Sequence, residues 1–329
     1  MQDIEYGAFI GSGSFSHVRS ASLRSIERAD PTDHTNVKPA DDESSNGYSE
    51  QSSQGTTLEE TNSSRHKQNV YALKKLRLDL PEKSILDGAI NLAKEGKLLS
   101  ALSHENIIDL RGLSEVGTFD DVFLVLEKLD DTLDRMMAEW RFSLAESRSS
   151  CSRHSYKMIK MKSLQLRQSV ICQIASGLKY LHEHNIVHRD LKPANIGVDH
   201  FNGLYKIFDF GLATELKDDH KIGPDRYVAH RNVGTRRYMA QEVFYGNVYG
   251  LSADVYSFGI LAWEILALET PFEDYDITSH EIYAYKKKRR PKLKPYWSQG
   301  IKQLVHSCWL HDPSNRPTMK DVYRQLKMC

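Results

Sequence analysis

Residues 188–195 read HRDLKPAN, and three of them carry polar groups that could act together in a reaction. Asp190 offers a carboxylate, which can accept a proton or orient a hydroxyl group. The ammonium of Lys192 can neutralise negative charge that builds up nearby, and the carboxamide of Asn195 supplies an oxygen ligand for a hard cation. The stretch is a candidate catalytic segment, provided that the rest of the chain supplies partners for these groups.

A second carboxylate follows after a predicted hairpin. Asn202 and Gly203 stand between two apolar runs, which is a strong signal for a tight turn between antiparallel strands. The hairpin returns the chain so that Asp209 should lie near Asn195. Mg²⁺ prefers carboxylate and carboxamide oxygens together with phosphate oxygens. The sequence therefore predicts that the carboxylates of Asp190 and Asp209 and the carboxamide of Asn195 converge as a set of oxygen ligands that suits Mg²⁺.

A glycine turn and a lysine could complete a phosphate site. The stretch 11–18, GSGSFSHV, reads as a turn between strands, and its glycines allow backbone amides to approach phosphates closely. Lys74 lies on the next predicted strand, facing the same side as Ala72, whereas Lys75 faces solvent. Glu95 lies in a predicted helix, where it could meet Lys74. Each signal alone is weak, since isolated lysine–glutamate pairs are common on surfaces. Their order and spacing together indicate one site.

The elements that must position these residues change along the chain. Residues 4–19 and 69–77 are typical of strands, 83–102 of a helix, and 122–129 of a buried strand. The remainder is mostly helical. One face of a long helix carries Leu166, Val170, Ile174, Leu178 and Leu181, and residues 251–268 are apolar nearly all round, as in a buried central helix. A strand-rich part followed by a helix-rich part predicts two lobes with a ligand cleft between them.

Two polar segments interrupt this pattern. From Pro31 to Asn69 the only apolar or aromatic side chains are Val37, Ala40, Tyr48 and Leu58. Such a segment cannot bury enough surface to offset its ordering entropy, so we expect residues 29–69 to be a disordered insertion. Residues 141–163 form a second, polar and basic insertion.

The bulk composition excludes several classes of protein. Lys plus Arg and Asp plus Glu both number 44, so no overall field steers the protein to nucleic acid or to anionic membranes. The four cysteines form no C-x-x-C pair, which argues against a zinc site or a disulfide framework. We expect a cytoplasmic, monomeric domain. The basic run at 286–294 is read as a solvated loop, with nuclear import or docking of an acidic substrate as alternatives.

Together these residues give the chain a resemblance to the protein kinase family over nearly its whole length. The matching positions are Gly11, Gly13, Phe15, Val18, Ala72, Lys74, Glu95, His188, Arg189, Asp190, Lys192, Asn195, Asp209, Phe210, Gly211, Ala240, Glu242, Asp254 and Arg316. The resemblance implies a two-lobed α+β fold, with an N-lobe at 1–129 and a C-lobe at 130–329. It also implies that ATP and Mg²⁺ bind in the cleft.

The resemblance also implies a role for each catalytic residue. Lys74, held by Glu95, would grip the α- and β-phosphates. Asp209 would chelate Mg²⁺ across the phosphates, and Asn195 would hold a second ion. Asp190 would accept the proton of the substrate hydroxyl, and Lys192 would neutralise charge on the transferred phosphoryl group. The implied nucleotide pocket consists of Ile10, Gly11, Ser12, Gly13, Phe15, Val18, Ala72, Lys74, Leu126, Glu127, Leu129 and Gly197, with the backbones of Glu127 and Leu129 facing adenine.

The substrate class follows from a few positions. Lys192, Pro193 and Thr235 are similar to the serine/threonine pattern, whereas residues 251–266 resemble the tyrosine-kinase-like group of serine/threonine kinases. We expect protein substrates phosphorylated on serine or threonine, with dual specificity as an alternative. A pseudokinase scaffold is a second alternative, although Lys74, Asp190 and Asp209 are all present. A P-loop enzyme is excluded, because the chain has no G-x-x-x-x-G-K-[ST] motif.

Three positions depart from the pattern of the family. Ser16 replaces the third glycine of the turn, and Gln241 replaces a proline beside Glu242, which is expected to pair with Arg316. Gly197 stands where a bulky aliphatic side chain usually packs under adenine. Either a neighbouring side chain fills this space, or the pocket is enlarged and loses contact with ATP. The second alternative leads to the hypothesis that Gly197→Leu tightens ATP binding.

Regulation is the last open question. In the family that this chain resembles, an arginine before the catalytic aspartate, here Arg189, often signals control by a phosphate on the activation segment, residues 209–242. The acidic residues of this segment include Glu215, Asp218, Asp219 and Asp225. One hypothesis is that one of these acids meets Arg189, so that no phosphate is needed. The rival is phosphorylation at Thr214, Tyr227 or Thr235.

Overall fold

The structure, a computed structural model, describes residues 4–13, 15–23, 70–114, 122–228, 233–246 and 248–328. The predicted insertion at 29–69 lies outside the described residues. The structure gives only the ends of the strands that flank it. Strand β2 ends at Leu23 and β3 begins at Val70.

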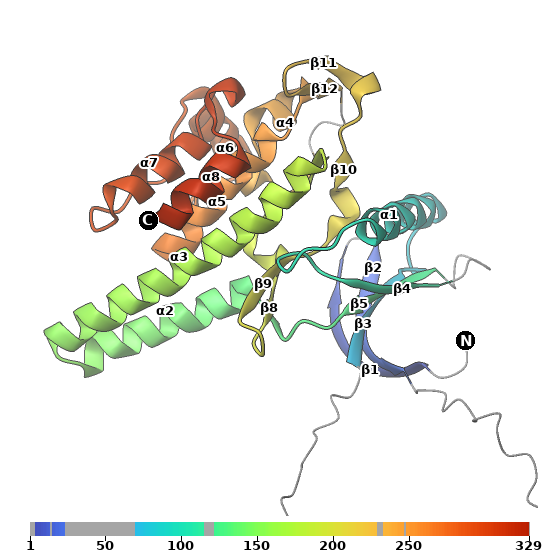
Figure 1. The fold of residues 1–329 in the computed structure, drawn as a ribbon, viewed down its shortest axis with the longest axis horizontal. Helices are drawn as coiled ribbons and strands as arrows, with labels where there is room; N and C mark the ends of the chain where they lie inside the picture. The colour runs from blue at the N-terminus through green and yellow to red at the C-terminus, as the bar shows by residue number, and fades with distance from the viewer. Residues whose placement is uncertain are drawn as a thin grey trace, which may run out of the picture.

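The first lobe is an antiparallel sheet with one helix (Figure 1). Its strand order is β1-β2-β3-β5-β4, comprising β1 (Ile4–Ser12), β2 (Ser16–Leu23), β3 (Val70–Leu76), β5 (Phe123–Glu127) and β4 (Leu110–Leu113). Helix α1 (Glu82–Ser100) lies against the sheet. A Cβ atom at Gly96 would lie 2.6 Å from a methyl carbon of Leu113 and 2.9 Å from one of Leu124, so this glycine allows the close contact. The contact fixes the position of α1 relative to β4 and β5.

The second lobe is helical, with one helix at its centre. Helix α5 (Ser252–Ala267) is buried from Ala253 to Leu266, which confirms the predicted central helix. Around it lie α2 (Leu133–Ser150), α3 (Arg153–Glu183), α4 (Gln241–Tyr245), α6 (Ile277–His280), α7 (Gln299–Cys308) and α8 (Met319–Met328). A π-helix, η6 (Glu281–Lys286), continues α6. The predicted α+β organisation is therefore confirmed.

Residues 141–163 belong to helices rather than to a loop. They form the end of α2 and the start of α3, which run side by side and project from the second lobe (Figure 1). The segment contains no glycine or proline to break a helix. The side chain of Ser152 accepts a hydrogen bond from the backbone of Ser155 and so caps the start of α3. Its polar composition reflects a solvated helical surface.

The hairpin predicted around Asn202 and Gly203 is confirmed. Strands β8 (Ile196–Asp199) and β9 (Leu204–Ile207) pair in antiparallel fashion, and Gly203 has a φ of +65°. The backbone N–H of Phe208 donates to the carbonyl of Asn195 at 3.0 Å. The chain thus returns Asp209 to the neighbourhood of Asn195. No helix in the described part of the chain is both long and apolar enough to cross a membrane.

Candidate active site

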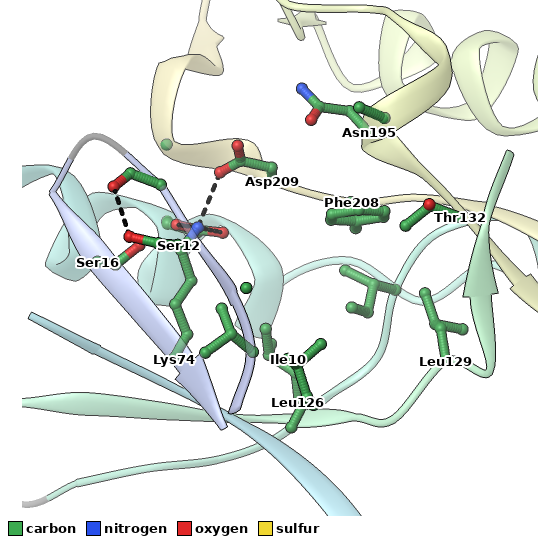
Figure 2. Close-up of a pocket in the computed structure, with 18 of the residues that line it drawn as sticks. Ile10, Ser12, Ser16, Lys74, Leu126, Leu129, Thr132, Asn195, Phe208 and Asp209 are labelled. Atoms are coloured by element: carbon green, nitrogen blue, oxygen red, sulfur yellow. Dashed lines mark hydrogen bonds and ion pairs between the residues drawn. The ribbon is translucent and has the colours of Figure 1, made fainter. Parts of the chain in front are cut away.

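A cleft of about 630 Å³ lies where residues of both lobes meet (Figure 2). Most of the residues expected around the nucleotide line it, namely Ile10, Gly11, Ser12, Gly13, Phe15, Val18, Ala72, Lys74, Leu126 and Leu129. Glu95, Asp190, Lys192, Asn195 and Asp209 also line it. Glu127 and Gly197 are not part of its lining. Sequence reasoning missed Ile108, Thr132 and Phe208, which line the same cleft.

Lys74 connects the sheet, the helix and the second lobe. Its Nζ atom lies 2.7 and 2.8 Å from the carboxylate oxygens of Glu95 and 2.8 Å from Oδ1 of Asp209. Burial by itself would lower the pKa of Lys74, but the charges of Glu95 and Asp209 outweigh it and raise the pKa. Lys74 is therefore a fixed positive charge facing the cleft. Lys75 points the other way along the strand, as the alternation of β3 predicts.

Asp190 is held by hydrogen bonds on both of its oxygens. Oδ1 accepts from the backbone N–H and the hydroxyl of Thr235 at 2.7 and 2.6 Å. Oδ2 accepts from Lys192 at 2.7 Å and from the amide of Asn195 at 3.0 Å. Burial opposes ionisation of Asp190, but the hydrogen bonds from Lys192 and Thr235 prevail and lower its pKa. The cluster keeps a carboxylate in one orientation at the base of the cleft.

The backbone of this segment is anchored to the central helix. The buried carboxylate of Asp254, in α5, accepts hydrogen bonds from the backbone N–H groups of His188 at 2.7 Å and Arg189 at 3.0 Å. Arg189 has a φ of +70°, which is strained for a residue with a long side chain. Such a conformation persists only where surrounding contacts impose it. By holding the backbone of His188 and Arg189, Asp254 therefore helps to fix the position of Asp190.

The donor set at Asn195 and Asp209 fits a magnesium ion. The amide nitrogen of Asn195 donates to Asp190, so a cation would bind through the carboxamide oxygen of Asn195. Burial by itself would raise the pKa of Asp209, but the charge and hydrogen bond of Lys74 outweigh this effect and lower the pKa, so Asp209 is ionised. Within the described ranges no three His, Cys, Asp or Glu side chains form a metal cluster. Two oxygen ligands from the protein, completed by phosphate oxygens, suit Mg²⁺.

The segment after Asp209 is packed inward. Phe210 is buried, lies edge-on to His188 with ring centroids 5.1 Å apart, and donates its backbone N–H to Glu95 at 3.2 Å. Asp209 itself has a φ of +62°. Glu95 thus contacts both Lys74 and the backbone beside Asp209. This arrangement couples the position of α1 to that of the Asp209 carboxylate.

Of the two alternatives for Gly197, the enlarged pocket is wrong. A Cβ atom at Gly197 would lie 2.1 Å from Cδ1 of Leu129 and 3.1 Å from its Cγ, so the Leu129 side chain fills the space. The alternative, in which a neighbour occupies the space beside the glycine, is confirmed. A larger side chain at 197 would have to displace Leu129, which removes the basis for expecting that Gly197→Leu tightens ATP binding.

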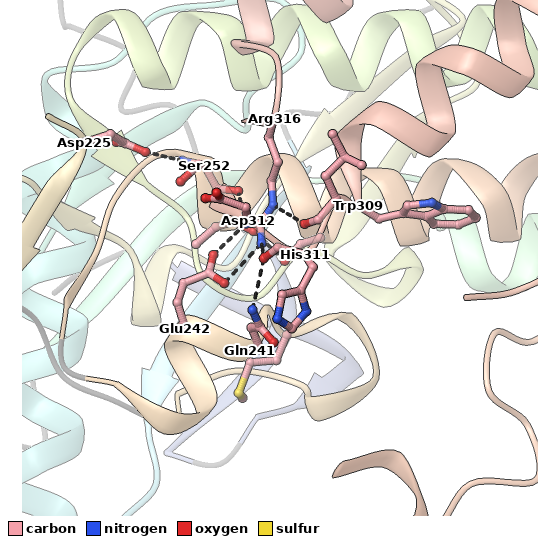
Figure 3. A network of polar contacts seen from close by, with 12 residues as sticks. Asp225, Gln241, Glu242, Ser252, Trp309, His311, Asp312 and Arg316 are labelled. Atoms are coloured by element: carbon pink, nitrogen blue, oxygen red, sulfur yellow. Dashed lines mark hydrogen bonds and ion pairs between the residues drawn. The ribbon is translucent and has the colours of Figure 1, made fainter. Parts of the chain in front are cut away.

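The other two departures are accommodated locally. Ser16 is buried in the turn, and its carbonyl accepts from the N–H of Gly13 at 2.8 Å. Gln241 donates its amide to the carbonyl of His311 at 3.0 Å (Figure 3). Beside it, the predicted pair of Glu242 and Arg316 is bidentate, with distances of 2.5 and 3.1 Å. Neither departure disturbs the cleft.

Among the described residues Arg189 meets no acid of the activation segment, so that hypothesis is wrong. Its Nε atom donates to the carbonyl of Leu212 at 2.5 Å, and Nη1 donates to the hydroxyl of Tyr249 at 2.9 Å. Asp225 binds elsewhere, accepting from the backbone N–H groups of Leu251 and Ser252 at 2.7 and 3.0 Å (Figure 3). Asp225 therefore binds the start of α5 and does not bind Arg189.

Comparison with known families and proteins agrees with this geometry. A family model described as protein kinase domain matches residues 54–326. Strands β1 and β2, with their glycine turn, precede the matched range, so their assignment to the cleft rests on the structure.

Three relatives illustrate the similarity. The chain is 32% identical over 237 residues to the dual specificity protein kinase shkD of Dictyostelium discoideum, covering 70% of this chain and 28% of that protein. It is 32% identical over 240 residues to the probable serine/threonine-protein kinase drkC of the same organism, covering 72% and 29%. It is 32% identical over 174 residues to the serine/threonine-protein kinase STY17 of Arabidopsis thaliana, covering 53% and 29%. The aligned region is under a third of each relative.

Proposed function

The chain belongs to the protein kinase family, and from this premise we propose that it is an ATP-dependent serine/threonine protein kinase. It would transfer the γ-phosphoryl group of ATP to hydroxyl groups of protein substrates. One observation carries the proposal: the Asp190 cluster and the pair of Lys74 and Glu95 face one cleft, with Asp209 touching Lys74. Phosphoryl transfer needs positioning and charge neutralisation, and these residues supply both.

Each residue has a role that its contacts support. Lys74 binds the α- and β-phosphates, and Glu95 keeps its ammonium over the cleft. Asp209 and Asn195 are the ligands for Mg²⁺, which when bound neutralises charge on the phosphates. Lys192, 2.7 Å from Asp190, neutralises charge on the transferred group.

Asp190 acts chiefly by orientation. Its lowered pKa makes it a weak base but a permanent acceptor for the substrate hydroxyl. Thr235 holds one oxygen of Asp190 and also accepts from Lys192 at 3.0 Å, so it fixes both groups. A hydroxyl aimed by Asp190 would attack the γ-phosphorus, the bond between this phosphorus and the β–γ bridging oxygen would break, and ADP would leave while the hydroxyl proton passes to the carboxylate.

Dual specificity is the second candidate, and the name of shkD favours it. Transfer of labelled γ-phosphate to degenerate peptide pools separates the two candidates, with one pool offering only serine and threonine and another only tyrosine. Transfer confined to the first pool supports the proposal, and transfer to both supports dual specificity. No transfer to either pool, even after addition of cell extract to supply an activator, would support the pseudokinase alternative.

We further propose that the protein acts in the cytoplasm on protein substrates, as a monomeric domain without nucleic-acid or membrane partners. The balanced charge supports this, as do the free thiols of Cys151, Cys172 and Cys308. The basic run at 286–294 is partly structural. Arg290 donates to the carbonyls of Ala284 and Trp309, which removes one cation from any docking surface. Fluorescence microscopy of the tagged chain tests the location, with nuclear accumulation as the contradicting result.

A further inference from the structure

Arg189 occupies a position that bears directly on Asp190. The two are adjacent, and the strained backbone of Arg189 sets the direction in which Asp190 enters the cleft. The guanidinium is fixed by two neutral acceptors, the carbonyl of Leu212 and the hydroxyl of Tyr249. Leu212 lies just after Asp209, so Arg189 joins the catalytic stretch to the start of the activation segment.

Tyr249 in turn belongs to a small sheet that holds the rest of that segment. Strand β13 (Val248–Tyr249) pairs with β12 (Arg226–Val228), where Tyr227 lies opposite Tyr249, and β12 pairs with β11 (Lys221–Gly223). Tyr249 is only 2% exposed. Residues 221–228 are therefore bound to a strand that itself contacts Arg189.

Asp225 fixes the same sheet to the core. It lies in the turn between β11 and β12, and its carboxylate accepts from Leu251 and Ser252 at the start of α5. Negative charge is favourable at this end of a helix. The activation segment is thereby attached to α5, the same helix that carries Asp254 beneath the catalytic stretch.

The hydroxyl-bearing residues of the activation segment are held in place by hydrogen bonds, packing or strand pairing. Tyr227 is 6% exposed and packs with Val187 and Leu216. Thr235 donates to Asp190, and Tyr238 donates to the buried carboxylate of Glu264 at 2.6 Å. Thr214 lies in β10 (Thr214–Glu215), which pairs with β7 (Ile186–Val187). Phosphorylation of Tyr227, Thr235 or Tyr238 would break the packing or hydrogen bond that now holds the segment.

We propose that Tyr249 is a positioning residue that holds Arg189 through its hydroxyl, so that the kinase adopts its active arrangement without a phosphate on residues 209–242. The inference rests on the proposed kinase function. Tyr249 is not among the residues that line the cleft, so it would act on Asp190 through Arg189. A hydroxyl can accept from a guanidinium without carrying a charge, so the contact requires no phosphate on the activation segment.

Two buried tyrosines provide a matched comparison. Tyr249→Phe removes the acceptor of Arg189, whereas Tyr256→Phe removes a buried hydroxyl that has no hydrogen-bond partner among the described residues. Steady-state kinetics on the full chain after phosphatase treatment, checked by mass spectrometry, gives kcat and the KM for ATP. We expect the dephosphorylated wild type to keep its full activity. We expect kcat to be about 10- to 100-fold lower in Tyr249→Phe, with little change in the KM for ATP, and both constants to have wild-type values in Tyr256→Phe.

A double-mutant cycle covers the case in which Tyr249→Phe is poorly folded. If the hydroxyl acts through Arg189, adding Tyr249→Phe to Arg189→Ala causes no further loss of kcat, whereas additive losses overturn the proposal. Equal kcat values for Tyr249→Phe and Tyr256→Phe also overturn it. If phosphatase treatment abolishes the activity of the wild type, this inference is overturned but the proposed kinase function is not. An absence of transfer both before and after phosphatase contradicts the proposed kinase function itself.

Discussion

Lys206 in β9 donates to the carboxylate of Glu127, the last residue of β5, at 2.7 Å. The same carboxylate oxygen accepts from the backbone N–H of Asp109 at 2.8 Å. The pair joins the hairpin beside the catalytic stretch to the strand whose end is expected to face adenine. This ion pair, whose side chains are 7% and 15% exposed, therefore helps to fix the relative position of the two walls of the cleft.

Lys206→Met should weaken ATP binding more than it slows the reaction. The substitution leaves the carboxylate of Glu127 without its cation, at a cost of about 1–3 kcal/mol in unfolding free energy. We expect the KM for ATP to rise several-fold with a smaller change in kcat. Lys179→Met is the control, since Lys179 pairs with Glu183 on an exposed helix face at 3.3 Å. Equal effects of the two substitutions would argue against a role for Lys206 at the cleft.

The protein should lose stability on mild acidification because of His280. Burial, reinforced by three nearby arginines, lowers the pKa of this histidine to about 4. The unfolded chain, with an ordinary histidine pKa of about 6.5, binds the proton first as the pH falls. The contribution of neutral His280 to the free energy of unfolding is therefore fully present above about pH 6.5 and is lost progressively between about pH 6.5 and pH 4.

His280→Phe should reduce this acid sensitivity. The ring lies among Phe272, Tyr275 and Tyr285, so phenylalanine suits the site. We expect the variant to lose about 1–2 kcal/mol less than the wild type between pH 7 and pH 5 in urea unfolding. Parallel stability curves for the two proteins across this range would show that His280 does not titrate as its surroundings indicate.

Gly197→Ala should weaken ATP binding rather than strengthen it. The added methyl group collides with Leu129 and pushes that side chain toward the cleft. Overpacking of a filled site costs about 1–3 kcal/mol, so we expect roughly a tenfold weaker affinity for ATP by calorimetry. Adding Leu129→Ala should recover much of the loss. Tighter binding in Gly197→Ala would mean that the space beside the glycine is open after all.

Glu242 should matter for stability far more than its neighbour Gln241. Glu242→Ala leaves the guanidinium of Arg316, whose side chain is 0% exposed, without its carboxylate, and about 3 kcal/mol of unfolding free energy should be lost. Gln241→Pro removes one hydrogen bond at the first residue of α4, where proline is tolerated, and should cost about 1 kcal/mol. Chemical denaturation of both variants gives the comparison, and a larger loss for Gln241→Pro would contradict it.

Local patterns in the sequence were sufficient for much of the fold and the cleft. The turn at Asn202 and Gly203, the alternation along β3 and the apolar helix at 251–268 all follow from interactions between near neighbours. They place Lys74 and Asp209 on elements that can meet. The resemblance to a known family then identified Glu95 as the partner of Lys74, which the structure places within hydrogen-bond distance.

Contacts between distant positions could not be predicted in the same way. The packing of Leu129 beside Gly197 depends on a side-chain rotamer, and the bond from Arg189 to Tyr249 joins residues 60 positions apart. Charge suggested an acidic partner for Arg189. The acid Asp225 instead accepts a hydrogen bond from a free backbone N–H group at the start of α5. The helical structure of the polar segment at 141–163 could not be predicted for another reason: solvated helices and loops share the same composition.

The most direct test of the account is the comparison of wild type with Asp190→Asn, measuring kcat for peptide phosphorylation and the dissociation constant for ATP with Mg²⁺ on the same samples. Asparagine keeps the shape of the side chain but neither attracts the substrate proton nor pairs with Lys192. We predict a kcat at least about 100-fold lower, with nearly unchanged ATP binding. A variant that transfers phosphate as fast as the wild type would contradict the central claim that the carboxylate of Asp190 directs the reaction.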